Sequence, residues 1–450
     1  CGRKFVAIMG GSCGENLTWF FYEGTLHIEG SGAMTDYDSH NIPWSTCAIE
    51  NVVISNGVTT IGSCAFWYKS FNEINLPASI TEIGAFAFCG CDITTISLPD
   101  AITKIGNEAF FDCRNLESVK LPESLTYLGI GVFADCEKLT SVVISEDNLS
   151  YSIVNNCIID KINSKLIMAY GINGSFTIPS GVLVIGEQAF SGCNGLTALT
   201  IPMGVTEIED KAFYKCAELV SVNLPASLTK IGNAAFADCG VLHDIALPSA
   251  LTYIGDEAFL NCAIQSIIIP DSVENIGDYA FSGCASLSEL TLNYGLKKIG
   301  INAFANCTAL KEVLIPATVT EIHGGAFIGC GALQKVIVTS NSTEIASDAF
   351  GEVRDGITFY VLVNSKADTY VYDKGFKFEY IAGGKCGESL TWYILDNIMY
   401  INGEGDMYKY EYDNSRDTYC GARSPWQVHF VRETIYTVVI GKGVTSISET

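Results

Sequence analysis

A phenylalanine followed three residues later by a cysteine recurs along most of this chain, at intervals of 22 or 23 residues outside one gap. Self-similarity at such a period is typical of solenoids, in which each repeat is one supersecondary unit stacked on the next. The phenylalanines are Phe88, Phe110, Phe133, Phe190, Phe213, Phe236, Phe259, Phe281, Phe304 and Phe327. Phe66 and Phe350 mark degenerate first and last repeats.

The residues of one repeat indicate its local structure. Residues 242–247 alternate apolar and polar positions, which predicts a short strand with one buried face. Pro248 ends this strand because proline has no donor for a ladder. After the proline of the preceding repeat, Pro225, residues 228–231 predict a second extended segment. Gly232 allows a sharp corner, and residues 233–239 predict a single helical or 3₁₀ turn with phenylalanine and cysteine inward.

A single repeat cannot fold alone. It offers only about eight inward side chains, worth roughly 1.5 to 3 kcal/mol each, against the ordering entropy of all its residues. Stacking on neighbours is therefore obligatory. We expect a solenoid in which the first strands of successive repeats form a parallel sheet.

The repeat consensus is Leu-Pro-x-x-Leu-Thr-x-Ile-Gly-x-x-Ala-Phe-x-x-Cys-x-x-Leu. It resembles the BspA-like leucine-rich-repeat family over about residues 52 to 350. The resemblance implies a leucine-rich-repeat solenoid, a parallel β ladder with short helical or 3₁₀ turns. Members of that family are typically secreted or cell-surface proteins of host-associated bacteria and some parasitic protists, implicated in adhesion to host proteins. A fold match fixes no ligand, because function resides in sites carried by folds.

A longer repeat links the two ends of the chain. Cys13-Gly-Glu-Asn-Leu-Thr-Trp19 recurs 373 positions later as Cys386-Gly-Glu-Ser-Leu-Thr-Trp392, so a small β-rich module is present twice and both ends look cut from a longer protein. The expected order is the tail of a preceding block (1–12), a β-rich module (13–51), the repeat array (52–350) with a hairpin-like interruption (145–178), a closing segment (351–383) and the second module (384–450).

The interruption lacks the phenylalanine and cysteine markers. Residues 153–170 predict a hairpin that turns near Asn163-Ser164. This hairpin either protrudes from the ladder or replaces part of one repeat.

The charge and hydropathy of the chain exclude several partners. Fifty acidic against 26 basic side chains give a formal charge of −24, which repels phosphate backbones and anionic membrane surfaces. Nucleic acid is therefore not an expected partner. Although 48% of the residues are hydrophobic, no apolar run approaches the roughly 18 residues that span a bilayer, so we expect no transmembrane segment.

Ten of the 18 cysteines share one register of the repeat, which predicts a column of buried, reduced thiols. Cys13 with Cys47, and Cys386 with Cys420, stand outside that register, and a disulfide in either module stays open. Cys89-x-Cys91 has no second pair at zinc-ligand spacing, so no metal is predicted.

Three motifs imitate catalytic patterns. Ser12 lies in a Gly-x-Ser-x-Gly string, but the second module has Lys385 at that position. Gly129 and His323 take the corner position of their repeats, which explains them without a cofactor. The five histidines are scattered, so no general base can be named. The sequence predicts neither an enzyme nor a cofactor, and calcium at Asp36, Asp38 and Asp406 is a minor alternative.

The outward positions of the first strands are the expected binding surface. From Ser266 onward they combine apolar and acidic side chains, which is typical of a partner patch. We predict a non-enzymatic binding or adhesion scaffold, secreted or on the cell surface, whose partner is a protein, including a host matrix or serum protein. The predicted patch is Ile268, Glu289, Thr291, Glu312, Leu314, Lys335 and Ile337.

Two alternatives stay open. A purely architectural spacer would lack a coherent patch. Glycan binding would use exposed aromatic side chains of the two modules as a stacking platform, although core packing of a small domain explains them more simply. These aromatic residues are Trp19, Trp44, Trp392, Trp426, Tyr408, Tyr410, Tyr412 and Tyr419. Threonines at one position of the second extended segments predict a stabilising ladder rather than a site.

Overall fold

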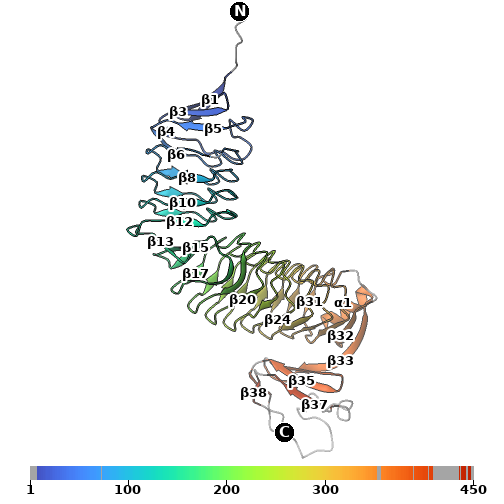
Figure 1. The fold of residues 1–450 in the computed structure, drawn as a ribbon. Coiled ribbons are helices and arrows are strands. Elements are labelled where there is room, and N and C mark those ends of the chain that lie inside the picture. The colour runs from blue at the N-terminus through green and yellow to red at the C-terminus, as the bar shows by residue number, and fades with distance from the viewer. Residues whose placement is uncertain are drawn as a thin grey trace, which may run out of the picture. The chain divides into compact units, whose positions relative to one another are not determined.

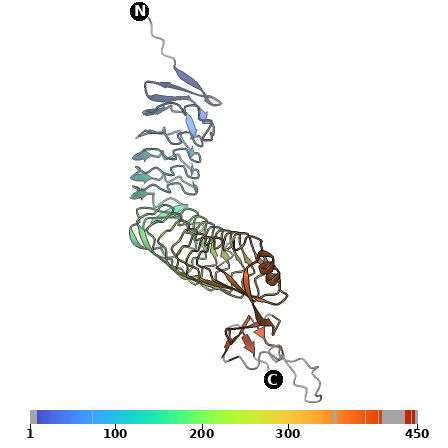
Figure 2. The same cartoon turned by 90° about the vertical axis from the view of Figure 1, so that its right-hand side faces the viewer.

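The structure is a computed structural model that describes residues 8–71, 73–351, 356–388, 390–403, 405–408, 435, 437–441 and 444–446. Packing divides the chain into two compact units, Cys1–Leu242 and His243–Thr450. Within each unit, short strands stack one above another as the rungs of a solenoid (Figures 1 and 2). The predicted fold, a parallel-ladder solenoid built from the 22–23-residue repeat, is confirmed.

Each rung of the first unit contributes a long strand and then a short strand. The long strands form two parallel sheets, β8 (Thr95–Ser97), β10 (Ser118–Lys120) and β12 (Ser141–Val143), then β16 (Gly174–Thr177), β18 (Leu196–Thr200) and β20 (Ser221–Asn223). The short strands form a second face, β6 (Val58–Ile61), β7 (Glu82–Ile83), β9 (Lys104–Ile105) and β11 (Tyr127–Leu128), then β17 (Val184–Ile185), β19 (Glu207–Ile208) and β21 (Lys230–Ile231).

The second unit repeats this arrangement. Its long strands are β22 (Asp244–Ile245), β24 (Ser266–Ile269), β26 (Glu289–Leu292), β28 (Glu312–Ile315), β30 (Lys335–Val338) and β32 (Thr358–Leu362). Its short strands are β23 (Tyr253–Ile254), β25 (Asn275–Ile276), β27 (Lys298–Ile299), β29 (Glu321–Ile322) and β31 (Glu344–Ile345). The helix α1 (Lys366–Lys374) closes the array, with its N-terminus capped by the Ser365 side chain and its C-terminus by left-handed Gly375.

The corner of each rung differs from the helical or 3₁₀ turn that we expected. In the rung of Phe236, Ala234 and Asp238 adopt left-handed φ values of 50° and 61°, which a right-handed helix cannot contain. The corner is therefore a succession of tight turns. These turns also stack, because the amide of Phe213 donates to the carbonyl of Ala235 in the next rung, at 2.8 Å.

Two columns of side chains fill the core. The phenylalanine rings stack face to face between rungs, for example Phe88 on Phe110 with centroids 5.3 Å apart and Phe281 on Phe304 at the same spacing. Beside them, most of the repeat thiols donate to the carbonyl oxygen of the phenylalanine one rung earlier, whereas Cys193 lies 3.9 Å from the carbonyl of Ala169. Cys113 donates to Phe88 at 3.1 Å. The cysteine thus combines a small apolar side chain with a weak donor, which gives a second hydrogen bond to a carbonyl that already accepts an amide within its own corner turn, as Phe88 does from Cys91 at 3.1 Å.

The interruption is a meander of three antiparallel strands, β13 (Tyr151–Val154), β14 (Cys157–Asp160) and β15 (Lys165–Ala169). It contains the expected hairpin between β14 and β15, and a second one that turns at Asn155-Asn156, both left-handed. Because β15 pairs in parallel with β17, the meander replaces a rung and starts the next short-strand face.

The first β-rich module caps the array. Its strands β1 (Met9–Gly14), β2 (Leu17–Tyr22) and β3 (Thr25–Gly30) are antiparallel. Strand β3 then pairs in parallel with β5 (Asn51–Ile54), and β4 (Gly32–Ala33) pairs in parallel with β6. The module core is therefore continuous with the first rungs of the array.

The second module repeats this topology. Strands β34 (Leu390–Leu395), β35 (Ile398–Gly403) and β36 (Gly405–Asp406) lie 373 positions after β2, β3 and β4. Strand β35 pairs with β37 (Thr437–Ile440), as β3 pairs with β5, and β36 pairs with β38 (Val444–Ser446), as β4 pairs with β6. The long strand β33 (Lys377–Lys385) pairs in parallel with β32 and in antiparallel with β34, so one strand belongs to both the array and the module.

Candidate interaction surface

The predicted patch lies on the outward face of the long strands of the second unit. Strand register places Ile268 beside Thr291, and Leu314 beside Ile337. Ile268 is 61% exposed, and Glu289, Thr291 and Glu312 are exposed as well. These four residues form a free surface on β24, β26 and β28, which we call the open patch.

The other part of the predicted patch is covered, and the expected exposure of Ile337 is wrong. Ile337 is only 8% exposed because it packs with Leu362, Ile381, Tyr393 and Leu395. The last two side chains come from β34 of the second module. The alternation along the strand does point Ile337 outward, but the module then covers it.

Two further patch residues lie at the edge of this contact. Leu314 is half-buried against the same cluster. The ammonium of Lys335 lies 3.4 Å from the carboxylate of Asp396 and 5.3 Å from the ring centroid of Tyr360. Lys335 therefore pairs with the module rather than with Glu312, its neighbour across the ladder. The contact escaped prediction because it depends on β33 carrying the chain into the module. The sequence feature that indicated this contact was the set of outward apolar residues in β32 to β34.

The module tryptophans that the structure describes, Trp19, Trp44 and Trp392, are buried, so these three offer no sugar-stacking platform. Trp44 is fully buried, its indole nitrogen donates to the carbonyl of Ala65 at 2.7 Å, and its ring lies against Phe66 at the head of the phenylalanine column. Trp19 and Trp392 are core residues of their modules. Tyr408 is exposed, whereas Trp426, Tyr410, Tyr412 and Tyr419 lie outside the described residues.

None of the described cysteines forms a disulfide, Cys13, Cys47 and Cys386 included. A disulfide between Cys13 and Cys47 is therefore absent, and Cys420 lies outside the described residues. Burial raises the pKa of Cys13 and of Cys386 to about 11. Their equivalent positions and equal shifts indicate the same structural role in both modules.

The residues that imitate catalytic motifs have structural roles. The hydroxyl of Ser12 donates to the carbonyl of Gly14 at 2.9 Å within a strand. The amide of Gly129 donates to the carbonyl of Ile105 in the preceding rung. The ring of His323 lies 3.1 Å from the carboxylate of Glu321 on a half-exposed face.

The carboxylates considered for calcium hold local structure. Asp36 accepts from the amide of Ser63 at 2.7 Å, and Asp406 from the hydroxyl of Thr445 at 2.8 Å. Asp38 closes a turn through the amide of His40. Across the described ranges, no group of three or more His, Cys, Asp and Glu side chains is placed to hold a metal ion.

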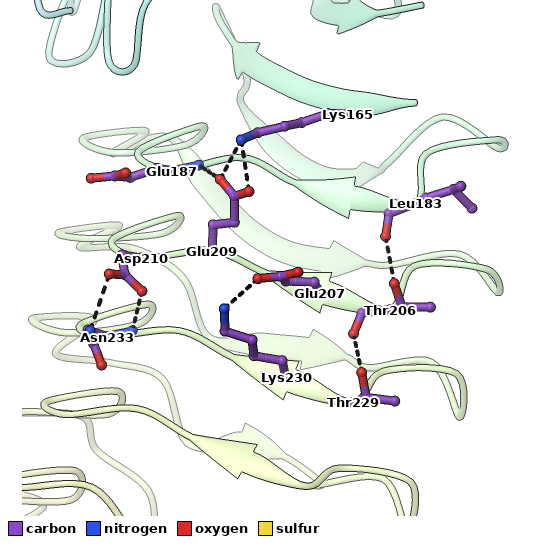
Figure 3. A network of polar contacts seen from close by, with 10 residues as sticks. All are labelled: Lys165, Leu183, Glu187, Thr206, Glu207, Glu209, Asp210, Thr229, Lys230 and Asn233. Atoms are coloured by element: carbon purple, nitrogen blue, oxygen red, sulfur yellow. Dashed lines mark hydrogen bonds and ion pairs between the residues drawn. The ribbon is translucent and has the colours of Figure 1, made fainter. Parts of the chain in front are cut away.

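A polar network covers the short-strand face of the first unit (Figure 3). The hydroxyl of Thr229 donates to the carbonyl of Thr206 at 2.9 Å, and Thr206 donates to Leu183 at 3.4 Å. Lys165 of the meander pairs with Glu209 at 2.6 Å. The polar groups of this face form hydrogen bonds and ion pairs with one another between rungs. The expected threonine ladder is therefore confirmed as a stabilising element.

The meander leaves a second apolar area that the sequence did not single out. Ile162 at its tip, Leu183 and Met203 are exposed. The amide of Leu183 donates to the carbonyl of Ser164 at 2.9 Å, so the tip lies beside the following rung. The signal was available, since all three are large apolar residues, Ile162 and Met203 in turns and Leu183 directly before β17.

Comparisons with known proteins agree with this architecture. A family model described as BspA type leucine rich repeat region, present in six copies, matches residues 43–165, 160–285 and 252–370. A leucine-rich repeat protein from Eubacterium ventriosum is 25% identical, with a TM-score of 0.63 over 72% of this chain and 96% of that one. A leucine rich cell surface protein from Faecalibacterium prausnitzii is 23% identical, with a TM-score of 0.45 over 64% and 95%.

The pneumococcal vaccine antigen PcpA is 18% identical, with a TM-score of 0.46 over 83% of this chain and 98% of that one. No curated protein matches this chain. Among the described residues, no helix has the length and apolar composition needed to cross a bilayer.

Proposed function

Because the chain belongs to the BspA-type leucine-rich-repeat family, we propose that it is a non-enzymatic scaffold, secreted or on the cell surface, that binds a protein partner. Host matrix and serum proteins are the partners we would test first. The observation that carries this proposal is the open patch, in which Ile268 stands exposed in a regular strand opposite Thr291, with exposed Glu289 on the same neighbouring strand. An aliphatic side chain with an acidic rim is the composition of a partner site.

The charge of the surface indicates the kind of partner. Lys335 pairs with Asp396, which leaves the carboxylate of Glu312 available, and the chain carries a formal charge of −24. A partner with a basic surface is therefore favoured, with contact to Ile268 contributing affinity and the carboxylates contributing orientation and association rate.

The experiment is a pull-down from host matrix and serum proteins, followed by surface plasmon resonance on the captured partner. We expect Ile268→Asp to weaken binding by roughly tenfold or more, because it places a charge where an apolar contact forms. Val143→Asp, at an exposed outward position of the first unit, is the matched control and should bind as the wild type does.

Leu314 is not used in this test because it packs against the second module. Equal affinity of the Ile268→Asp and Val143→Asp variants would exclude the open patch. The absence of any saturable partner would favour an architectural spacer.

A further inference from the structure

The two modules carry matching outer faces. In the second module this face consists of Ile381, Tyr393, Leu395 and Tyr400, on strands β33 to β35. The residues 373 positions earlier are Ile8, Phe20, Tyr22 and His27. Cross-strand pairing is also the same, since Phe20 lies opposite His27 as Tyr393 lies opposite Tyr400.

The side chains of the two faces adopt the same arrangement. The ring of Phe20 stacks on that of His27 with centroids 4.4 Å apart and planes at 6°. The ring of Tyr393 stacks on that of Tyr400 at 4.8 Å and 13°. Stacked aromatic pairs at corresponding positions form equivalent flat apolar surfaces.

In the second module the outer face is buried. Ile381, Tyr393 and Leu395 pack with Ile337 and Leu362, and the half-buried Leu314, Tyr360 and Tyr400 border the same cluster. The outward side of strands β28, β30 and β32 is called the array end. Its apolar residues are Leu314, Ile337, Tyr360 and Leu362. The outer face thus binds the last long strands of a repeat array.

In the first module the same face is partly exposed among the described residues, which exclude residues 1–7. Ile8 is 59% exposed and Tyr22 is 41% exposed, and Phe20 and His27 are half-buried. The opposite face of this module, with Leu17, Trp19 and Ile28, packs into the core that continues into the array that follows. One face of the first module therefore packs against its array, and the other is an apolar surface that no array among the described residues covers.

A charge completes the match. Asp396, whose carboxylate meets Lys335 of the array end, corresponds to Glu23 in the first module, and both stand in left-handed turns with φ of 52° and 45°. The first module thus presents an acidic group where the second uses one to hold an array lysine.

We propose that the outer face of the first module is a docking site for the end of a leucine-rich-repeat array with apolar outward strands and a lysine, as in Leu314, Ile337, Tyr360 and Lys335. The β-rich module is then a two-sided joint between arrays. Its inner face binds the array that follows, and its outer face binds another array.

The test uses the chain's own array end as the probe. In the full chain this end is covered by the second module, so the wild type should not associate through it. Tyr393→Asp with Leu395→Asp places two charges in that contact and uncovers the array end. We expect this variant to self-associate in sedimentation equilibrium, head to tail, through the first module of a neighbouring molecule.

The control is to add Tyr22→Asp and Glu23→Lys on the outer face of the first module, which should weaken association by roughly tenfold or more. Val143→Asp, outside the proposed contact, should leave it unchanged. Chemical labelling of Lys335 reports whether the array end is uncovered. If Lys335 stays protected, a variant that ends at residue 376 removes the module entirely.

A monomer with Lys335 uncovered would overturn the proposal. Association that persists after the changes at Tyr22 and Glu23 would overturn it as well, because an exposed array end could then be pairing with itself.

Discussion

A single thiol in most rungs serves the fold twice, as a filler of the core and as a donor to a carbonyl of the rung before it. The bond from Cys284 to the carbonyl of Phe259 is 3.2 Å long, and the equivalent bond from Cys91 to Phe66 is 3.0 Å. Such regularity explains why cysteine recurs without forming disulfides. A serine would retain a donor but replace the polarisable sulfur by a polar oxygen, and an alanine would lose both the donor and the volume of the sulfur.

The buried thiols of the chain, inside and outside the repeat register, should make its stability fall in alkaline solution. Burial raises the pKa of Cys89, Cys157, Cys193 and Cys284 to about 12, whereas an unfolded thiol titrates near about 8.5. The stabilisation is therefore fully present below about pH 8.5 and is lost as pH rises toward 12. Urea unfolding monitored from pH 7 to 11 should give a falling free energy of unfolding.

Cysteine-selective alkylation should label few sites before unfolding and most of them after, and extensive labelling of the native state would contradict buried thiols.

Among the elements, the meander is joined at its start to the preceding rung by buried polar side chains. Asn148 is almost fully buried, and its amide donates to the carbonyls of Glu123 at 2.8 Å and Leu125 at 2.9 Å. The hydroxyl of Tyr151 accepts from the amide of Leu128 at 2.8 Å. These side chains supply the hydrogen bonds that a regular rung would supply through its backbone.

Asn148→Ala should therefore destabilise the first unit by roughly 2 to 4 kcal/mol, because it leaves buried carbonyls without donors. Limited proteolysis at the meander and urea unfolding would measure this change. Asn163→Ala is the control, since its side chain bonds only to exposed Asp160 in a turn and should have little effect. Equal proteolysis of both variants would show that Asn148 does not hold the meander.

The equivalence of the two module faces makes a prediction within the full chain. Replacing Tyr393, Leu395 and Tyr400 by Phe, Tyr and His gives the second module the outer face of the first. Since both faces have the same stacked pair, the module should stay docked and Lys335 should label slowly, as in the wild type. Lys335 labelling as fast as in the Tyr393→Asp, Leu395→Asp variant would mean that the two faces are not interchangeable.

At the scale of the whole molecule, the sequence predicts the solenoid because every repeat carries the same inward residues, and stacking has no alternative that buries them. The sequence predicts the exposure of a side chain less well where that side chain has two possible environments. Ile337 is outward by strand alternation and buried by the module, a contact between segments far apart in the chain. The corner turns were missed because left-handed φ values at residues such as Ala234 and Asp238 leave no signature in apolar spacing.

The one-dimensional architecture also determines how damage spreads. Phe304 is fully buried, with its ring stacked between Phe281 at 5.3 Å and Phe327 at 5.4 Å. Phe304→Ala should lower the free energy of unfolding by about 3 to 5 kcal/mol. Because each rung is stabilised only by its neighbours, the loss divides the second unit into segments that unfold separately. Calorimetry should therefore show a broader or split transition rather than a uniform shift. Ile301→Ala, which shortens an exposed side chain of the same rung, should leave the transition sharp, and a single sharp transition in both variants would mean that the rungs unfold as one block.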